Sequence, residues 1–312
     1  MPMPPEYEWK DARYGAHKGA VLWQKGADTL IECACCGFRH IVPLPSETVQ
    51  KAFYEESFYQ SEKAKYLAEA EEDFAWKAVE CGLRIDIAVE LSGIKAGRVL
   101  DIGSGPGDFL KVAQSRGWDA VGIEPSPVAA RYAASRGLNV INGFFNADTA
   151  KDLGRFDFIH LSEVLEHIAE PESLLKLARS LLKKNGVLCV SVPNDFNPLQ
   201  GVSVKKLEKE KWWIVPDHHL NYFDFDSLTG LIEKNSLRVK KELTNFPMEL
   251  FLLMGQDYAG NPALGRQMHG WRKTMDTNIA EVSPELLRTF YEKLAEARMG
   301  RLAIVFAVLG DE

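Results

Sequence analysis

The sequence lacks several features that mark whole classes of proteins. No apolar run approaches the roughly 18 residues that a membrane-spanning helix needs, and the apolar stretch 250–254 is far too short. The first fifteen residues, MPMPPEYEWKDARYG, have no basic segment followed by an apolar core, so they do not resemble a secretory signal. Five cysteines, an odd number, do not indicate a disulfide framework in a chain of 312 residues. These absences predict a reduced, cytoplasmic protein without a membrane partner.

An excess of positive charge is also missing. Lysine and arginine number 37 against 44 aspartates and glutamates, for a net charge of -7. Because domains that bind nucleic-acid phosphates are usually basic, this negative net charge disfavours nucleic acid as a partner. The hydrophobic fraction of 46% and the charged fraction of 26% are typical of a globular domain long enough to bury a sizeable core.

What the sequence does contain is a regular alternation of strands and helices that begins at residue 98. Short, largely apolar segments predict strands at 98–104, 119–125, 139–145, 156–163 and 186–194. Helical patterns separate them at 108–116, 127–136 and 171–184. Strands of this kind are expected where helices cover both faces of a sheet, so the fold class is α/β with a doubly wound parallel sheet.

The remaining segments divide the chain into three parts. Residues 1–97 form an N-terminal extension with a small cysteine-containing segment and helices, including one over 67–91. Residues 98–245 and 301–312 form the core, with a lid-like segment at 195–216. Residues 246–300 form a helical insertion, which we expect to be a substrate cover or an oligomer contact, with a homodimer as one option.

A glycine-rich turn follows the first core strand in VLDIGSGPGDFL, residues 99–110. Dinucleotide sites use the pattern G-x-G-x-x-G, but here the glycines are Gly103, Gly105 and Gly107 and the next residue is Asp108. A pyrophosphate ligand is therefore disfavoured, whereas Asp101 before the turn suits a ligand with a cationic centre. Glu124 ends the next strand about 20 residues later, where a carboxylate can accept hydrogen bonds from both ribose hydroxyls.

Four motifs in this order, VLDIGSGPGDFL, GIEPSP, FDFIHLSEVLEHI and GVLCVSVPN, resemble those of class I S-adenosylmethionine-dependent methyltransferases, and in particular the ubiquinone-pathway O-methyltransferase-like group. The resemblance implies a seven-stranded Rossmann-like sheet whose last strand is antiparallel. It implies that Asp101 and the glycine turn contact the methionine part of the cofactor, that Glu124 holds the ribose, and that residues 146–148 flank the adenine. The full set of cofactor-binding residues implied is Asp101, Gly103, Ser104, Gly105, Glu124, Pro125, Asn146 and Ser162.

The stretch SEVLEH follows the fourth strand and places Glu163, Glu166 and His167 at the spacing i, i+3, i+4, which predicts one face of a helical turn. In one interpretation these side chains shape a polar pocket. In the other, which the resemblance supports, they bind Mg²⁺, Mn²⁺ or Zn²⁺ together with His219, or His218, and are the catalytic group. A cation there would lower the pKa of a hydroxyl and orient it toward the sulfonium methyl group.

A second cluster of metal-ligand residues lies near the N-terminus in IECACCGFRH. Cys33 and Cys36 have the C-x-x-C spacing of half a zinc ribbon, and the second half is missing from the sequence. His40 or His17 would have to complete a structural zinc site. The alternative is a small β-structure that retains vestigial cysteines, and we prefer it on the sequence alone.

These observations predict an enzyme, an S-adenosylmethionine-dependent methyltransferase that acts on a small-molecule hydroxyl, of a sugar or a diol-bearing metabolite. Three alternatives stay open: a sugar C- or N-methyltransferase, an RNA 2′-O-methyltransferase, and a non-catalytic subunit that binds the cofactor. The aromatic segment 53–66 is expected either to fold over the cofactor or to pack as an amphipathic helix.

Overall fold

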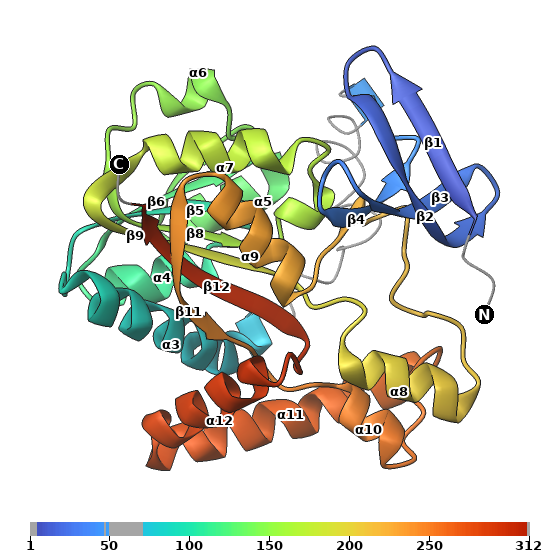
Figure 1. Ribbon diagram of the computed structural model, residues 1–312. Helices are drawn as coiled ribbons and strands as arrows, with labels where there is room; N and C mark the ends of the chain where they lie inside the picture. The colour runs from blue at the N-terminus through green and yellow to red at the C-terminus, as the bar shows by residue number, and fades with distance from the viewer. Residues whose placement is uncertain (1–4, 47, 50–70, 311–312) are drawn as a thin grey trace.

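The computed structural model describes residues 5–46, 48–49 and 71–310 (Figure 1). The aromatic segment 53–66 and the start of the helix expected over 67–91 lie outside these residues. The described chain forms two sheets, one of seven strands and one of five. No helix in the described ranges combines the length and the apolar character that a bilayer crossing requires.

The seven-stranded sheet confirms the predicted α/β class. Its strand order is β11-β12-β9-β8-β5-β6-β7. The central strands pair in parallel, whereas β12 runs antiparallel to both of its neighbours. The strands are β5 (Arg98–Ile102), β6 (Asp119–Glu124), β7 (Asn139–Asn142), β8 (Phe156–Ser162), β9 (Leu182–Pro193), β11 (Leu237–Leu243) and β12 (Leu302–Leu309).

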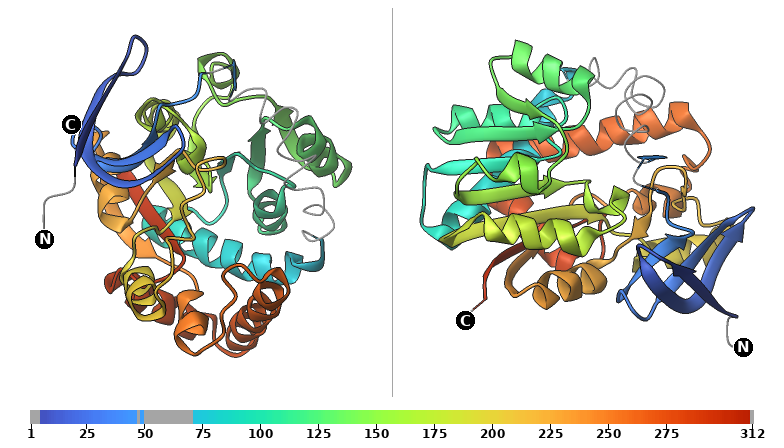
Figure 2. Two further views of the ribbon diagram at one scale, coloured as in Figure 1. Left: turned by 90° about the vertical axis from the view of Figure 1, so that its right-hand side faces the viewer. Right: turned by 90° about the horizontal axis from the view of Figure 1, so that it is seen from above.

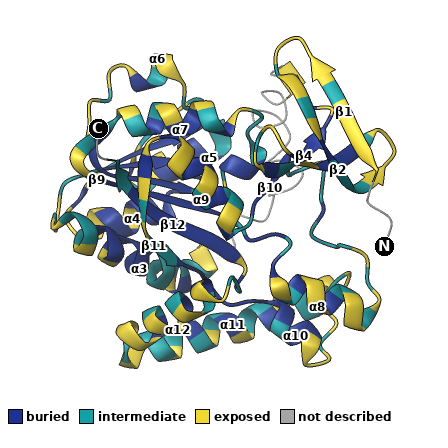
Figure 3. Cartoon of the chain, viewed as in Figure 1, coloured by how far each residue is buried: buried dark blue, intermediate teal, exposed yellow. Residues whose placement is uncertain are grey.

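Helices cover both faces of this sheet, so its central strands are buried on each side (Figure 3). One face packs against α7 (Pro171–Ser180) and α9 (Phe225–Lys234). The other packs against α3 (Phe74–Ser92), α4 (Asp108–Ser115), α11 (Pro262–Val282) and α12 (Pro284–Glu296). Further helices of the described ranges are α5 (Pro127–Ser135), α6 (Ala147–Ala150), α8 (Pro198–Leu207) and α10 (Glu249–Leu253), with a short 3₁₀ turn, η2 (Leu165–His167).

Side-chain caps set where several helices begin. Ser126 accepts a hydrogen bond from the Ala129 amide ahead of α5, and Pro127 occupies the first turn, where its missing amide costs nothing. Asp224 begins α9 and forms a capping box with Ser227. The part of the chain expected as a lid contains α8, which begins after its cap Asn197.

The five-stranded sheet is built from two distant parts of the chain. The N-terminal strands β1 (Glu6–Asp11), β2 (Gly15–Lys25), β3 (Asp28–Cys33) and β4 (Phe38–Val42) form antiparallel pairs in sequence order. The fifth strand, β10 (Asn221–Tyr222), pairs with β4. Figure 2 shows its N-terminal strands, in blue, at the side of the larger layered body. The pairing of β4 with β10 therefore ties the N-terminal extension to the core.

Candidate active site

A cavity of about 500 Å³ opens at the carboxyl ends of β5 and β8, the edge where parallel α/β sheets bind ligands. Its lining comes from α3, the glycine turn, the end of β8 and the segment before β10, and includes Asp101, Ser104, Ser162, His167 and His219. A second cavity of about 140 Å³ adjoins it and is lined by Glu124, Pro125, Phe144 and Phe145 among others. Gly103 and Glu163 line both cavities. Apart from Asn146 and Glu166, every predicted site residue therefore lines a cavity.

The glycine turn requires glycine at position 103 for two reasons. Its φ angle of +74° lies in the left-handed region that side chains with a Cβ rarely adopt. A Cβ on Gly103 would also lie 2.5 Å from the Val164 side chain. The turn thus brings bare backbone to the cavity.

Glu124 is the buried carboxylate at the end of β6, with an exposed fraction of 4%. It accepts hydrogen bonds from the amides of Gly105 and Ser126, each at 2.8 Å, which orients it between the glycine turn and α5. Burial raises the pKa of Glu124 to about 7, although the two amide hydrogen bonds oppose the shift. Each carboxylate oxygen can accept further hydrogen bonds, so the group fits the two adjacent hydroxyls of a ribose.

The structure differs from expectation at Asn146. This residue does not line either cavity, and its side chain instead caps α6 by accepting hydrogen bonds from the amides of Asp148 and Thr149. Phe144 and Phe145, just before it, line the smaller cavity. Aromatic rings suit the flat face of an adenine, and the sequence pattern NGFF contained this signal.

The helical turn expected at SEVLEH is also different in the structure. Only Leu165–His167 form a turn, of the tighter 3₁₀ type, and Glu163 lies before it with a left-handed φ of +56°. The Glu163 amide donates to the Ser191 carbonyl on β9, which holds the chain in strand-like pairing up to this residue. The three acidic and imidazole side chains therefore do not share one helical face.

Glu166, His167 and His219 nevertheless come together. One ligand atom from each lies within 4.8 Å of the others, and Glu163 is not a member of this group. The His167 Nδ1–H donates to the His218 carbonyl at 2.7 Å, so a neutral ring presents Nε2, 3.8 Å from a Glu166 oxygen.

Glu166 is unusual because it is a carboxyl group 1% exposed whose two oxygens have no hydrogen-bond partner among the described residues. Burial, reinforced by the charge of Glu163, raises the pKa of Glu166 well above its ordinary value. A buried carboxyl group without a hydrogen-bond partner is costly, so its retention beside His167 and His219, which line the larger cavity, points to a bound ligand.

Sequence reasoning missed a buried polar chain that crosses the floor of the larger cavity. Arg84 on α3 donates to Ser162 Oγ at 2.9 Å and to His160 Nε2 at 3.0 Å. His160 in turn donates from Nδ1 to Asp101 at 2.7 Å and stacks on Phe109 with ring centroids 3.9 Å apart. Burial lowers the pKa of His160, which keeps the ring in the neutral form that this hydrogen-bond order needs. A charged residue in the helical segment ECGLRID and a histidine inside the apolar strand FDFIHLS were the available signals.

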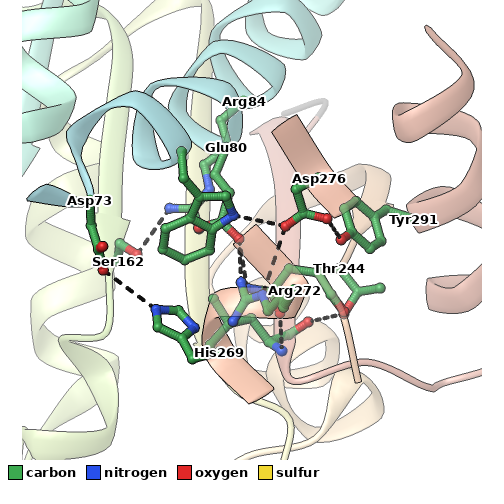
Figure 4. Close-up of polar contacts among 12 residues, drawn as sticks. Asp73, Glu80, Arg84, Ser162, Thr244, His269, Arg272, Asp276 and Tyr291 are labelled. Atoms are coloured by element: carbon green, nitrogen blue, oxygen red, sulfur yellow. Dashed lines mark hydrogen bonds and ion pairs between the residues drawn. The ribbon is translucent and has the colours of Figure 1, made fainter. Parts of the chain in front are cut away.

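A second polar cluster lies on the same face of α3 as Arg84, nearer the start of the helix (Figure 4). Arg272 on α11 donates to Glu80 at 2.6 Å and lies 4.6 Å from the centre of the Trp76 ring. Asp276 accepts hydrogen bonds from the Trp76 indole and from the Tyr291 hydroxyl on α12. Since Trp76 and Glu80 line the larger cavity, the helices of the 246–300 segment support the wall of the site.

Comparisons with known proteins agree with this geometry. A profile of a methyltransferase domain family matches residues 75–242. A ubiquinone biosynthesis O-methyltransferase from Actinobacillus pleuropneumoniae is 34% identical over 123 residues, 36% of this chain and 53% of the relative. The same enzyme from Cereibacter sphaeroides is 31% identical over 150 residues, 45% of this chain and 60% of the relative. The chain thus spans about half the length of the curated relatives it matches.

Solved structures share the fold. The plantazolicin methyltransferase BpumL, in complex with S-adenosylhomocysteine (SAH), aligns with a TM-score of 0.51 at 14% identity, over 84% of this chain and 96% of that one. The fold and the site define a class I S-adenosylmethionine-dependent methyltransferase, and the chain belongs to the methyltransferase domain family. Its cofactor supplies an electrophilic methyl group on a sulfonium centre. The buried Glu124 carboxylate, the glycine turn and the Asp101 end of the polar chain are the residues that fit it.

Proposed function

We propose that the protein methylates a hydroxyl group of a small molecule, and that Glu166, His167 and His219 hold a divalent cation against that hydroxyl. The observation that carries the proposal is Glu166, a fully buried carboxyl group without a hydrogen-bond partner among the described residues. It lies with two imidazoles within 4.8 Å, a mixed oxygen and nitrogen set that suits Mg²⁺, Mn²⁺ or Zn²⁺.

Such a cation would activate the acceptor hydroxyl. A hydroxyl is a weak nucleophile near neutral pH, and a bound cation supplies a lower hydroxyl pKa and a fixed orientation. Three protein ligands leave coordination positions for a substrate, as is usual for a catalytic rather than a structural metal. Glu163, which lines both cavities, adds negative charge beside the cation without belonging to the ligand group.

Oxygen as the methylated atom is supported by the relatives named O-methyltransferases, although they match only part of this chain. The acceptor class that we propose, a sugar or another compound with adjacent hydroxyls, is one that can chelate the cation with two oxygens. Because the net charge of the chain is negative, we rank RNA below small molecules as the methyl acceptor.

Manganese binding tests the cation site directly. The purified protein with SAH bound should bind one equivalent of Mn²⁺, followed by electron paramagnetic resonance, because the free ion signal disappears on binding. Glu166→Gln and His219→Ala should lose this binding, since each removes one ligand. Asp217→Asn, which neutralises an exposed carboxylate two residues from His219, should keep it. Equal Mn²⁺ binding by wild type and Glu166→Gln would refute the cation site and leave these residues as polar lining.

A further inference from the structure

Four side chains of the five-stranded sheet converge at a place remote in sequence from the catalytic motifs. His17 comes from β2, Cys33 from the end of β3, Cys36 from the following turn and His40 from β4. One atom from each lies within 4.8 Å of all the others. Cys33 and His40 are 2% and 1% exposed, so the cluster is closed to solvent on that side.

The distances match a tetrahedral zinc site. Bond lengths of about 2.3 Å to sulfur and 2.05 Å to nitrogen, at tetrahedral angles, place two nitrogens about 3.3 Å apart and sulfur about 3.6 Å from nitrogen. The observed separation of His17 Nδ1 from His40 Nε2 is 3.1 Å. Those from His17 Nδ1 to the sulfurs of Cys33 and Cys36 are 3.7 and 3.4 Å.

In both histidine rings, the nitrogen that faces away from the cluster is hydrogen-bonded to a backbone carbonyl. His17 Nε2 donates to the Tyr14 carbonyl at 3.0 Å, and His40 Nδ1 donates to the Ile41 carbonyl at 3.0 Å. Each neutral ring then turns a lone pair toward the other, which is repulsive unless a proton or a cation lies between them. Backbone carbonyls on the outer nitrogens are the arrangement that orients zinc-bound histidines.

The turn that carries the cysteines is shaped for such a site. The Gly37 amide donates to the Cys33 carbonyl at 2.9 Å, and Gly37 has a left-handed φ of +79°, which folds the C-x-x-C-G segment back on itself. Cys35, in the same turn, is exposed and does not belong to the cluster. A substitution at Cys35 is therefore a control for substitutions at Cys33 and Cys36.

We propose that His17, Cys33, Cys36 and His40 bind one structural zinc ion, which locks the five-stranded sheet and thereby fixes β10 beside the active site. Four protein ligands complete a tetrahedron, so the ion is structural and has no position for substrate. The missing second C-x-x-C half of a zinc ribbon is replaced here by two histidines from neighbouring strands. The sequence alone favoured the vestigial interpretation because it does not show that β2 and β4 bring these histidines to the cysteines.

The connection to the active site runs through a few hydrogen bonds. His40 is paired in register with Asn221 of β10, and the Ile41 amide donates to the Leu220 carbonyl at 2.8 Å. Leu220 in turn donates its amide to the Glu166 carbonyl at 2.8 Å. The ion would therefore be a positioning element for the segment that carries His219.

Metal content of the full chain tests the proposal first. The protein purified from zinc-supplemented cells should contain about one zinc ion per chain by elemental analysis. Cys33→Ser and Cys36→Ser should lose most of it, whereas Cys35→Ser and the active-site variant Glu166→Gln should keep it. A folded wild-type protein without zinc, or equal zinc in Cys33→Ser, Cys36→Ser and wild type, would overturn the proposal.

A second measurement keeps the test decisive if the serine variants fold poorly. His17→Cys preserves four ligands, so it should bind Co²⁺ with stronger sulfur-to-metal charge-transfer absorption than the wild type, because a third thiolate is present. Removal of zinc should speed hydrogen exchange at the Ile41 and Asn221 amides while SAH affinity stays unchanged. A mass two daltons low after purification would instead reveal a Cys33–Cys36 disulfide, and unaltered exchange would refute the positioning role.

Discussion

At the scale of single residues, we expect Glu124 to couple cofactor binding to pH. Burial raises its pKa to about 7, so the carboxyl group becomes protonated at mildly acidic pH. A protonated group accepts hydrogen bonds poorly, and we expect the dissociation constant of SAH to rise about tenfold per pH unit below pH 7. Calorimetric titrations from pH 5.5 to 8.5 measure this, and Glu124→Gln should bind weakly with a flat profile. A flat wild-type profile would contradict the assigned role of Glu124.

Glu166 should leave a signature in stability. Its folded-state pKa is raised above the ordinary 4.5, so the folded protein holds its proton more tightly than the unfolded chain. The stabilisation is complete below pH 4.5 and is lost as pH rises toward the folded-state pKa. Urea denaturation of metal-free protein should therefore show a steeper loss of stability with rising pH in wild type than in Glu166→Gln. Parallel curves for the two proteins would show that Glu166 is not the buried, partnerless group described here.

A residue's role can be predicted from the sequence when it depends on local spacing, and not when it depends on contacts between distant elements. The roles expected for Glu124 and the glycine turn could be proposed from the sequence because they depend on local spacing along the chain, and they stay predictions. Arg84 and His160 were missed because their partnership joins α3 to β8, 76 residues apart. Glu163 was placed on a helical face because the spacing fits one, but its amide bonds to β9 and its φ is left-handed, so it lies between β8 and the 3₁₀ turn.

At the scale of elements, one asparagine joins β10 to the 3₁₀ turn. The Asn221 side chain donates to the carbonyls of Leu165 and Ile168 at 2.8 and 2.7 Å. Asn221→Ala removes the donor of two buried carbonyls, at a cost in the free energy of unfolding of about 1–3 kcal/mol for each carbonyl. It also frees the turn that carries Glu166 and His167. We expect Mn²⁺ affinity to fall at least tenfold while SAH affinity stays within twofold. Asn278→Ala, at an exposed site on α11, is the matched control, and unchanged Mn²⁺ binding by Asn221→Ala would contradict this coupling.

The attachment of α11 to α3 depends on an ion pair between the buried Arg272 and the half-buried Glu80. Burial opposes the charge of Glu80, but Arg272 and Arg84 hold the pKa of Glu80 below its ordinary value. Arg272→Met should lower the free energy of unfolding by about 2–4 kcal/mol, toward the lower end for a broken buried pair, because it leaves the half-buried Glu80 carboxylate with one partner fewer. Adding Glu80→Gln should restore part of that loss in chemical denaturation. A double variant as unstable as the sum of the two single variants would mean that the pair is not coupled.

For the whole molecule, the alternation of strands and helices predicted the α/β class and the parallel sheet, because buried parallel strands and their covering helices repeat a regular pattern. The number of seven strands and the antiparallel last strand came from the resemblance to the methyltransferase family. The segment 246–300 was read only as helical, and its role as a substrate cover or oligomer contact stays a prediction. Its contacts to α3 come from polar side chains such as Arg272 and Asp276, which the hydrophobic periodicity of the sequence does not reveal. The sequence suggested a small β-structure around the cysteines, but not a five-stranded sheet, since its last strand comes from residues 221–222.

The most direct test of the account is transfer of a labelled methyl group. The zinc-loaded protein is incubated with methyl-labelled S-adenosylmethionine and a low-molecular-mass extract of the cells that make it, in parallel with Glu166→Gln and with brief EDTA treatment. Elemental analysis confirms that the structural zinc is retained. We expect a labelled methyl ether whose formation stops with EDTA, returns with added Mg²⁺ or Mn²⁺, and is absent with Glu166→Gln. Label on carbon or nitrogen, or transfer that EDTA and Glu166→Gln leave unchanged, would contradict metal-assisted O-methylation.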